Sequence, residues 1–283
     1  MSPRLSAALQ HLVPQRLCCR FIYRLARSRR PWLKRLLITS FERLYAIDLD
    51  EAEIVESSAY PSFNAFFTRA LKAGARPLDG DEDTIVSPAD GRVTEFGRIK
   101  QGRLLQAKGR SYSLADLLGE PDAIVEPFRG GAYLTVYLAP HNYHRVHAPL
   151  AGRIERARFI PGSRFSVNAS TVQAIDSVFC RNERVVLWLA TAVGPCAVVM
   201  VGALNVSSLT TVLTGEIPSG QARVFAATDA DAIARGGELG RFNLGSTIVL
   251  LFPAGAAEWL PALEHGQAIR MGQRLGRAIQ RGR

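Results

Sequence analysis

The fold of this chain is restricted above all by a succession of short apolar runs separated by glycine and proline. Beyond residue 83, runs rich in β-branched and aromatic residues alternate with turn residues, and the whole chain holds 24 glycines and 15 prolines. Runs of this kind are typical of β-strands joined by tight turns. They predict strands at residues 84–86, 92–94, 133–138, 153–159, 185–190, 197–201, 210–213 and 247–252. The predicted fold class is α+β, with a predominantly antiparallel β core.

Two stretches of this core echo each other and suggest a duplicated, hairpin-like unit. Residues 87–93, Ser-Pro-Ala-Asp-Gly-Arg-Val, align with residues 148–154, Ala-Pro-Leu-Ala-Gly-Arg-Ile. Both carry turn residues directly before a β-branched residue, as expected where a strand begins. A repeat of this kind would relate two halves of the core by a pseudo-twofold axis. It would also bring Asp90 close to a run of histidines that ends at His147.

The first 59 residues carry a different pattern, in which apolar residues recur at helical spacing between arginines. Residues 17–25 show this period, as do residues 33–44 after Pro31, a residue that suits a first helical turn. Residues 1–45 hold ten lysines and arginines against one glutamate, a formal charge of +9 out of +10 for the whole chain. We expect two basic amphipathic helices on an anionic membrane, where each basic residue contributes about 1 kcal/mol. The alternatives are docking of their apolar faces on the body, and a mitochondrial presequence.

Four apolar residues, Phe63, Phe66, Phe67 and Leu71, form one stripe at helical spacing, which predicts a helix packed in the core.

No stretch of the sequence reaches the roughly eighteen apolar residues of a membrane-spanning helix. The membrane contact that we expect is therefore peripheral.

Three of the five histidines fall within seven residues, at positions 141, 144 and 147. We expect His141 to be an ordinary surface or core histidine. Zinc binding would add a carboxylate or cysteine ligand, and neither occurs at a recognisable spacing. Binding of a phosphate or lipid headgroup together with Arg145 is an alternative. General acid–base chemistry by His144 and His147 fits best, because histidine titrates near neutrality and Asp90, in a tight turn, can fix a histidine tautomer.

A Gly-Ser bond stands at the mouth of the last long apolar run, at Gly245-Ser246. Alone it indicates only a turn that enters a strand. Together with a histidine and an aspartate it supplies the parts of an activated serine nucleophile.

These motifs resemble the phosphatidylserine decarboxylase family, in order, over roughly residues 60 to 275. The matching stretches are residues 64–69 (NAFFTR), 76–77 (RP), 87–91 (SPADG), 105–109 (LQAKG), 143–147 (YHRVH), 165–168 (FSVN), 181–184 (RNER) and 242–247 (FNLGST). The basic amphipathic N-terminus is similar to that of the bacterial, membrane-bound members. One departure is Ser207, where the family usually has glycine.

The resemblance implies a proenzyme that cuts its own chain. In such an enzyme Asp90 orients His147, and His147 takes the proton of Ser246. Ser246 attacks the carbonyl of Gly245, where the lack of a side chain leaves the approach open. The products are a large subunit, residues 1–245, and a small subunit, residues 246–283.

The resemblance also implies a covalent cofactor, a pyruvoyl group derived from Ser246. It would condense with the amine of phosphatidylserine and act as an electron sink as carbon dioxide leaves, which gives phosphatidylethanolamine. His144 is our candidate for the acid that reprotonates the carbanion, so that His144 and His147 serve separate steps. No metal is expected.

The same resemblance sets the expected organisation and location. Residues 1–59 would be a basic, membrane-associating helical region, and residues 60–283 a β-rich catalytic domain. The expected partners are phosphatidylserine, an anionic membrane surface, and the large subunit with the small one. A homodimer is left open, because the sequence does not give the oligomeric state. The expected location is the cytoplasmic side of a bacterial inner membrane, as a peripheral protein.

Three other functions stay open at this point. A pyruvoyl decarboxylase could act on another serine-headed lipid. A membrane-binding module without catalysis would leave Gly245-Ser246 a plain turn and the histidines structural. Nucleic-acid binding through the basic arm is disfavoured, because its aromatic residues and leucines follow helical stripes and do not form an exposed stacking platform.

Overall fold

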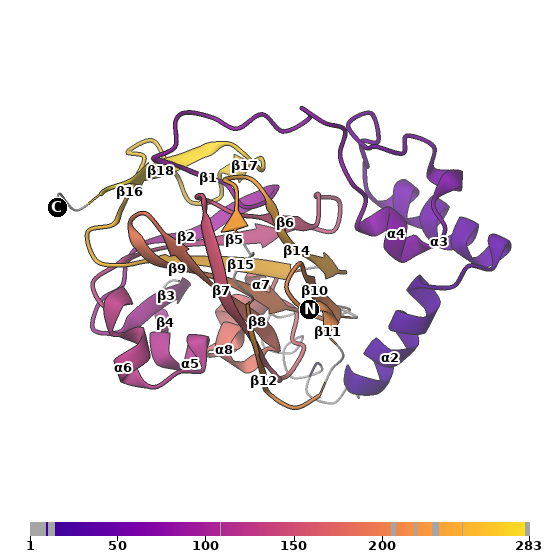
Figure 1. The fold of residues 1–283 in the computed structure, drawn as a ribbon. Coiled ribbons are helices and arrows are strands. Elements are labelled where there is room, and N and C mark those ends of the chain that lie inside the picture. Colours follow the sequence, from indigo (N-terminus) through magenta and orange to yellow (C-terminus); the bar gives the residue numbers. More distant parts are fainter. Residues whose placement is uncertain are drawn as a thin grey trace.

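The computed structural model describes residue 10 and residues 15–107, 109–204, 208–217, 220–227, 232–244 and 246–280, with the backbone alone for residues 15, 16 and 246. Gly245 and Ser207 lie outside these residues. Helices form the N-terminal region and short connections within the body (Figure 1). Their bounds are α2 Gln15–Ala26, α3 Pro31–Leu44, η1 Ser57–Ala59, α4 Phe63–Phe67, α5 Leu114–Leu118, α6 Asp122–Val125, η2 Glu126–Phe128, α7 Ala169–Ala174 and α8 Val178–Arg181.

Strands make up the body, and all pairings between these strands are antiparallel, as the sequence predicts. The bounds of the strands are β1 Thr84–Val86, β2 Gly91–Arg98, β3 Arg103–Ala107, β4 Arg110–Ser113, β5 Ala132–Leu138, β6 Arg145–His147, β7 Gly152–Ile160, β8 Arg184–Thr191, β9 Gly194–Gly202, β10 Ser208–Thr211, β11 Gly215–Ile217, β12 Arg223–Ala226, β13 Ala232–Ile233, β14 Glu238–Asn243, β15 Ser246–Phe252, β16 Ala257–Trp259, β17 Ala268–Ile269 and β18 Arg274–Ala278. The fold is therefore α+β.

The largest sheet has nine strands in the order β12-β7-β8-β9-β15-β5-β2-β17, with β13 beside β7. Its strands β8, β9, β15 and β5 are apolar along most of their length, which is typical of strands covered on both faces. β15 lies at the centre, between β9 and β5. The remaining sheets are β11-β10-β14-β6, β1-β18-β16 and the hairpin β3-β4.

The sequence echo corresponds to two related positions in the large sheet. Gly91 begins β2 and Gly152 begins β7, and these strands lie second from opposite ends of the sheet. The turns before them are bonded to each other: the Val86 amide donates to the Pro149 carbonyl (3.1 Å), and the His147 amide donates to the Pro88 carbonyl (2.8 Å). The predicted proximity of the two turns is confirmed.

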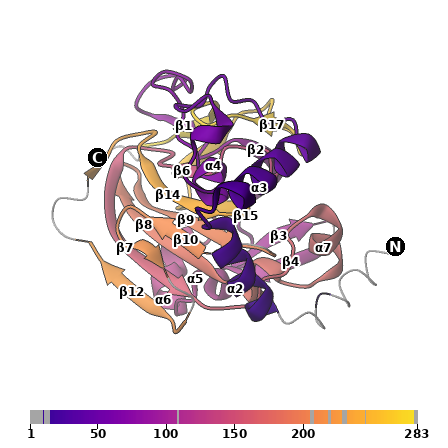
Figure 2. The ribbon, with the colours of Figure 1, turned by 90° about the vertical axis from the view of Figure 1, so that its right-hand side faces the viewer.

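The N-terminal helices α2 and α3 lie to one side of the sheets, and a view from that side shows them across the front of the body (Figures 1 and 2). Their inner residues join a separate apolar cluster with α4, formed by Ala26, Ile38, Tyr60, Phe63, Phe66, Phe67 and Leu244. We call this set the helix cluster. It ties the two basic helices to Leu244, two residues before Ser246.

The outer sides of the same helices expose large apolar side chains. Leu17 and Phe21 of α2 are 64% and 67% exposed, and Trp32 of α3 is 64% exposed. Arg20 and Arg24 are exposed near them. Each of the two helices therefore packs one apolar side on the body and exposes another apolar side, because it has apolar residues on two sides. No helix in the described residues is long and apolar enough to cross a bilayer.

The helix expected over the phenylalanine stripe is shorter than predicted. α4 ends at Phe67 and does not reach Leu71. The cause is Thr68, whose amide (2.9 Å) and hydroxyl (2.8 Å) both donate to the carbonyl of Asn64 and close the last turn. Leu71 instead forms an isolated bridge with Ala52. The three phenylalanines are buried, as predicted.

The strand expected at residues 210–213 is also displaced. β10 runs from Ser208 to Thr211 and then turns. The hydroxyl of Thr211 accepts the amide of Thr214 at 3.0 Å and so replaces the next ladder bond with a turn. The predicted strands also leave out β3, β4, β6, β11, β12, β13, β14, β16, β17 and β18, which are short or polar. In β14 a glycine and an arginine interrupt the apolar pattern.

Candidate active site

The backbone is strained directly before the Gly-Ser bond. Leu244 has a φ of +85°, a conformation that costs energy for a residue with a side chain. Its side chain is buried in the helix cluster, which holds it in place. Ser246 follows as the first residue of β15, paired with Leu138 on one side and Gly202 on the other. The strain therefore lies at the entrance to the central strand.

Asn243 fixes the chain on the other side of Leu244. Its amide group donates to the hydroxyls of Ser208 and Thr210, each at 2.9 Å. Its amide oxygen accepts from the amide of Asn64 in α4, at 3.1 Å. β14 is thus anchored to both β10 and α4 at the point where the chain enters the strained segment.

His147 is buried, and its hydrogen bonds define its tautomer. Nδ1 lies 2.8 Å from the Gly236 carbonyl, which can only accept, so Nδ1 carries the proton. Nε2 lies 3.0 Å from the Tyr143 hydroxyl and accepts from it. Burial lowers the pKa of His147, against the opposing effects of the Gly236 carbonyl, Glu238 and Asp90. The imidazole is therefore neutral, with its lone pair on Nε2.

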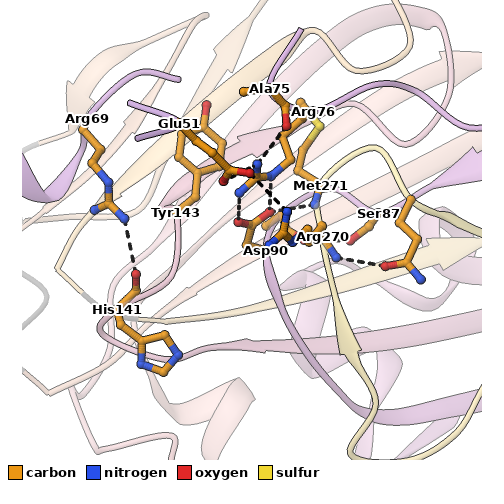
Figure 3. Close-up of polar contacts among 12 residues, drawn as sticks. Glu51, Arg69, Ala75, Arg76, Ser87, Asp90, His141, Tyr143, Arg270 and Met271 are labelled. Carbon is orange, nitrogen blue, oxygen red and sulfur yellow. Dashed lines mark hydrogen bonds and ion pairs between the residues drawn. The ribbon is translucent and has the colours of Figure 1, made fainter. Parts of the chain in front are cut away.

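Asp90 is held by three charge-assisted or backbone hydrogen bonds (Figure 3). Arg76 donates from Nε to Oδ1 (3.0 Å) and from Nη2 to Oδ2 (2.6 Å), a bidentate pair. The Met271 amide donates to Oδ1 at 2.8 Å. Glu51 accepts from the remaining side of Arg76 at 2.6 Å. This network fixes the Asp90 carboxylate and connects it to Met271, which lies in the segment after Ser246.

The structure brings Asp90 and His147 into neighbouring turns without a direct bond between their side chains among the described residues. Burial lowers the pKa of His147, and the charge of Asp90 opposes this less than the Gly236 carbonyl and Glu238 do. Nδ1 of His147 is bonded to the Gly236 carbonyl, which holds the ring orientation, and the orienting role expected for Asp90 stays a prediction.

His144 is completely buried and stacks on Phe67, with 4.1 Å between ring centroids. Its Nε2 lies 3.3 Å from the Pro140 carbonyl, so Nε2 carries the proton. Nδ1 is buried and has no hydrogen-bond partner among the described residues. Burial lowers the pKa of His144 to about 3, so the ring is neutral near pH 7.

The register of β6 and β14 separates the two histidines. His147 pairs with Glu238 at the start of β14. The His144 carbonyl accepts the Phe242 amide (3.0 Å) near the end of β14 that leads to Ser246. Along this strand, His144 is the nearer of the two to the Gly-Ser bond. His141 is exposed, and its carbonyl accepts from Arg69 at 3.3 Å.

For two residues of this site, Tyr143 and Gly236, the sequence gives no indication of their role. Tyr143 belongs to the histidine motif, yet nothing in its spacing indicates that it caps Nε2 of His147. Gly236 acts through a carbonyl 89 residues away along the chain. In the described part of the chain, no group of three or more His, Cys, Asp or Glu residues is arranged to hold a metal.

Comparison with known proteins gives the family. The family model described as phosphatidylserine decarboxylase matches residues 63–277, and a second model, described as PSD, matches residues 5–46.

A relative from Halorhodospira halophila is 49% identical over 277 residues (97% of this chain, 94% of the relative). A relative from Ectopseudomonas mendocina is 47% identical over 285 residues (98% and 99%). One from Alcanivorax borkumensis is 45% identical over 278 residues (96% and 96%). All three are named phosphatidylserine decarboxylase proenzyme. The chain belongs to the phosphatidylserine decarboxylase family.

Proposed function

We propose that this protein decarboxylates phosphatidylserine to phosphatidylethanolamine, with a pyruvoyl group that it makes from Ser246. The observation that carries the proposal is the strained Leu244 at the entrance to β15, next to a buried corner that holds His144. Family membership and the relatives' names support the substrate and the existence of a proenzyme.

The first step would be cleavage between Gly245 and Ser246. The Ser246 hydroxyl attacks the Gly245 carbonyl and loses its proton to Nε2 of His147, the ring atom that bears the lone pair. Positive charge then develops on the imidazole, and the fixed carboxylate of Asp90 stabilises it. Relief of the strain at Leu244 favours the step. The Gly245–Ser246 C–N bond breaks as the ester forms, and the freed amine takes the proton from His147.

β-Elimination would then remove the Cα proton of residue 246 and break its Cβ–O bond, so that residues 1–245 leave with a carboxylate on Gly245. Water would displace the nitrogen of the remaining dehydroalanine as ammonia, which leaves the pyruvoyl ketone at the start of residues 246–283.

A pyruvoyl group at position 246 would supply an electrophilic ketone for an amine and an electron sink for the loss of carbon dioxide. The surroundings fit such a group, because the apolar helix cluster includes Leu244 and Phe67. His144 stacks on Phe67, and its Nδ1 has no partner in the described part of the chain. His144 would hold and deliver the proton that replaces carbon dioxide. Its pKa of about 3 means that it is neutral without substrate, and an anionic substrate beside it would raise that pKa.

The substrate is a lipid, and the N-terminal region would bring the site to it. We propose that residues 1–59 form a membrane-associating region and that residues 60–283 form the catalytic domain. The exposed Leu17, Phe21 and Trp32, with exposed arginines between them, suit an anionic membrane surface. We place the protein on the cytoplasmic side of a bacterial inner membrane as a peripheral enzyme.

The test is the intact mass of purified protein and of single variants. We expect two fragments that meet between Gly245 and Ser246, with a blocked N-terminus on the smaller one. Ser246→Ala should stay intact. His147→Ala should also stay intact, whereas His144→Ala should be cut but release little carbon dioxide from phosphatidylserine vesicles.

Three results would overturn parts of this proposal. An active, uncut chain, or normal cutting of Ser246→Ala, would remove the pyruvoyl mechanism. Equal loss of cutting in the two histidine variants would refute their separate roles. Faster release of carbon dioxide from another serine-headed lipid would change the substrate.

A further inference from the structure

A cavity of about 190 Å³ lies between the segment after α4 and strands β6 and β14. Buried Tyr60 and Thr68 form part of its lining, and exposed Glu53 and Ile54 lie at its rim. Three arginines line it as well, namely Arg69, Arg145 and Arg241. None of these three arginines has a role in the proposed cleavage or decarboxylation.

Arg69 is the most unusual of the three, because it is only 5% exposed and few protein groups bond to its guanidinium. Its single hydrogen bond to the protein among the described residues is a long one of 3.3 Å, from Nη2 to the His141 carbonyl (Figure 3). Nε and Nη1 are buried and have no hydrogen-bond partner within the part of the chain that the structure describes. Burial lowers the pKa of Arg69, which marks an energetic cost of keeping this cation. A buried guanidinium with free donors is costly unless an anion joins it.

The other two arginines add positive charge on the sheet side of the cavity. They are cross-strand partners on β6 and β14, and both pair with Glu238: Arg145 at 2.8 Å and Arg241 at 3.2 Å. One carboxylate thus serves two guanidinium groups. Glu53 lies in the lining as well, so three arginines face two carboxylates, Glu53 and Glu238. These groups together keep an excess of one positive charge.

We propose that this cavity binds an oxyanion of the phosphate class, through Arg69 with Arg145 and Arg241. Planar guanidinium groups present paired N–H donors that match the oxygens of such an anion. Several converging cations favour a phosphate over a single hydroxyl or amide.

The phosphate can come from a lipid headgroup or from free phosphate. The rim favours a lipid, because Ile54 and its neighbour Val55 are exposed and apolar beside the opening. The acyl chains of a lipid would then stay outside while its phosphodiester enters. If that lipid is the substrate, the inference rests on the proposed function. Binding should therefore be measured in a chain that cannot process itself.

The experiment uses the full-length Ser246→Ala chain and calorimetric titration at constant ionic strength. One arm titrates inorganic phosphate, and the other titrates glycerophosphoserine, which carries the phosphodiester headgroup without acyl chains. We expect saturable binding that Arg69→Gln weakens about tenfold or more, since hydrogen bonds to charged groups are the strong ones. Arg98→Gln, an exposed arginine of β2, is the matched control and should bind normally.

Arg241→Gln provides a second variant at a less buried position, in case Arg69→Gln does not fold. Tighter binding of glycerophosphoserine would assign the site to a lipid headgroup, and tighter binding of phosphate would assign it to the free ion. No saturable binding in either arm, or equal losses in Arg98→Gln and the site variants, would overturn the inference. Neither result depends on chain cleavage, so a failure of the proposed function would be seen separately.

Discussion

His147 already has the tautomer that a general base needs, but its lone pair is occupied. The Tyr143 hydroxyl donates to Nε2, the atom that would take the proton of Ser246. In the proposed mechanism the Tyr143 hydroxyl and the Ser246 hydroxyl would compete for this one acceptor. Burial raises the pKa of Tyr143 to about 12, so the phenol stays protonated and remains a donor at neutral pH. Tyr143 thus holds His147 in position and also restrains it.

Replacing Tyr143 with phenylalanine tests this restraint. A donor to Nε2 stabilises the neutral imidazole, so the Tyr143→Phe change should raise the pKa of His147. In the proposed mechanism neutral His147 is the base, so cleavage should slow as the pH falls through its pKa. In the variant this fall should move to higher pH by about one unit, since one hydrogen bond is worth roughly 1 kcal/mol. Cleavage of freshly made chain, followed on gels between pH 5 and 8, measures the shift.

The matched control is Tyr133→Phe, which removes the hydroxyl of another buried tyrosine, in β5. It should leave the pH midpoint of cleavage unchanged. The plateau rate of Tyr143→Phe at high pH should not fall, because serine then has no competitor for Nε2. An unchanged midpoint in Tyr143→Phe would contradict the assigned role.

The sequence predicts which residues gather at this site better than it predicts their bonds. The echo of residues 87–93 in residues 148–154 places Asp90 beside His147, and backbone bonds between the turns confirm this. The bond from the Met271 amide to Asp90 spans 181 residues and uses a backbone group, which leaves no trace in the sequence. The same holds for the Gly236 carbonyl.

The structure shows where the apolar sides of helices α2 and α3 lie, a question that the periodicity of the sequence leaves open. A helix with one apolar stripe must place it on the body or on a membrane. These helices carry apolar residues on two sides, so Ala26 and Ile38 are buried while Phe21 and Trp32 face outwards. Because Leu244 lies in the same helix cluster, a membrane that contacts the helices would lie close to the strained segment.

The outward side chains should determine membrane binding independently of chain cleavage. Burial of a large apolar side chain contributes about 1.5–3 kcal/mol, so Phe21→Asp or Trp32→Asp should weaken binding to anionic vesicles by about tenfold or more. Self-cleavage should proceed normally, because neither side chain packs in the body. Vesicle sedimentation at several lipid concentrations gives the affinity, and gels give the extent of cutting.

Val224→Asp is the control for these variants, since Val224 is 54% exposed on β12, in the body. It should bind vesicles as the unaltered chain does. Equal weakening in all three variants would indicate a general effect of added negative charge and would exclude a specific membrane-facing surface.

The long buried strands can be predicted from the sequence, since continuous apolar runs such as 247–252 mark strands covered on both faces. Short helices and strands with polar residues at their ends are harder to predict from the sequence. α4 ends early because Thr68 bonds back to Asn64, a side-chain choice that periodicity does not contain. β14 mixes glycine, arginine and asparagine and is stabilised by its partners β6 and β10, which only the folded chain supplies.

Across the whole molecule, the segment after Gly245 is distributed among several sheets. β15 is the central strand of the nine-stranded sheet, β17 pairs with β2, and β18 joins β1 to β16. The Met271 amide also binds Asp90. Cleavage at this position would therefore cut the chain without separating any sheet, because ladder bonds on both sides hold β15.

The two fragments should consequently stay together as one particle after cleavage. Ile248, Val249, Leu250, Leu251 and Phe252 of β15 are all fully buried, and their burial alone contributes on the order of 10 kcal/mol. Cleaved protein should elute from a sizing column at the same volume as uncut Ser246→Ala and should separate only in denaturant. Native mass spectrometry on progressive dilution would detect loss of the smaller fragment. Its release without denaturant would show that β15 contributes less to the association than its burial implies.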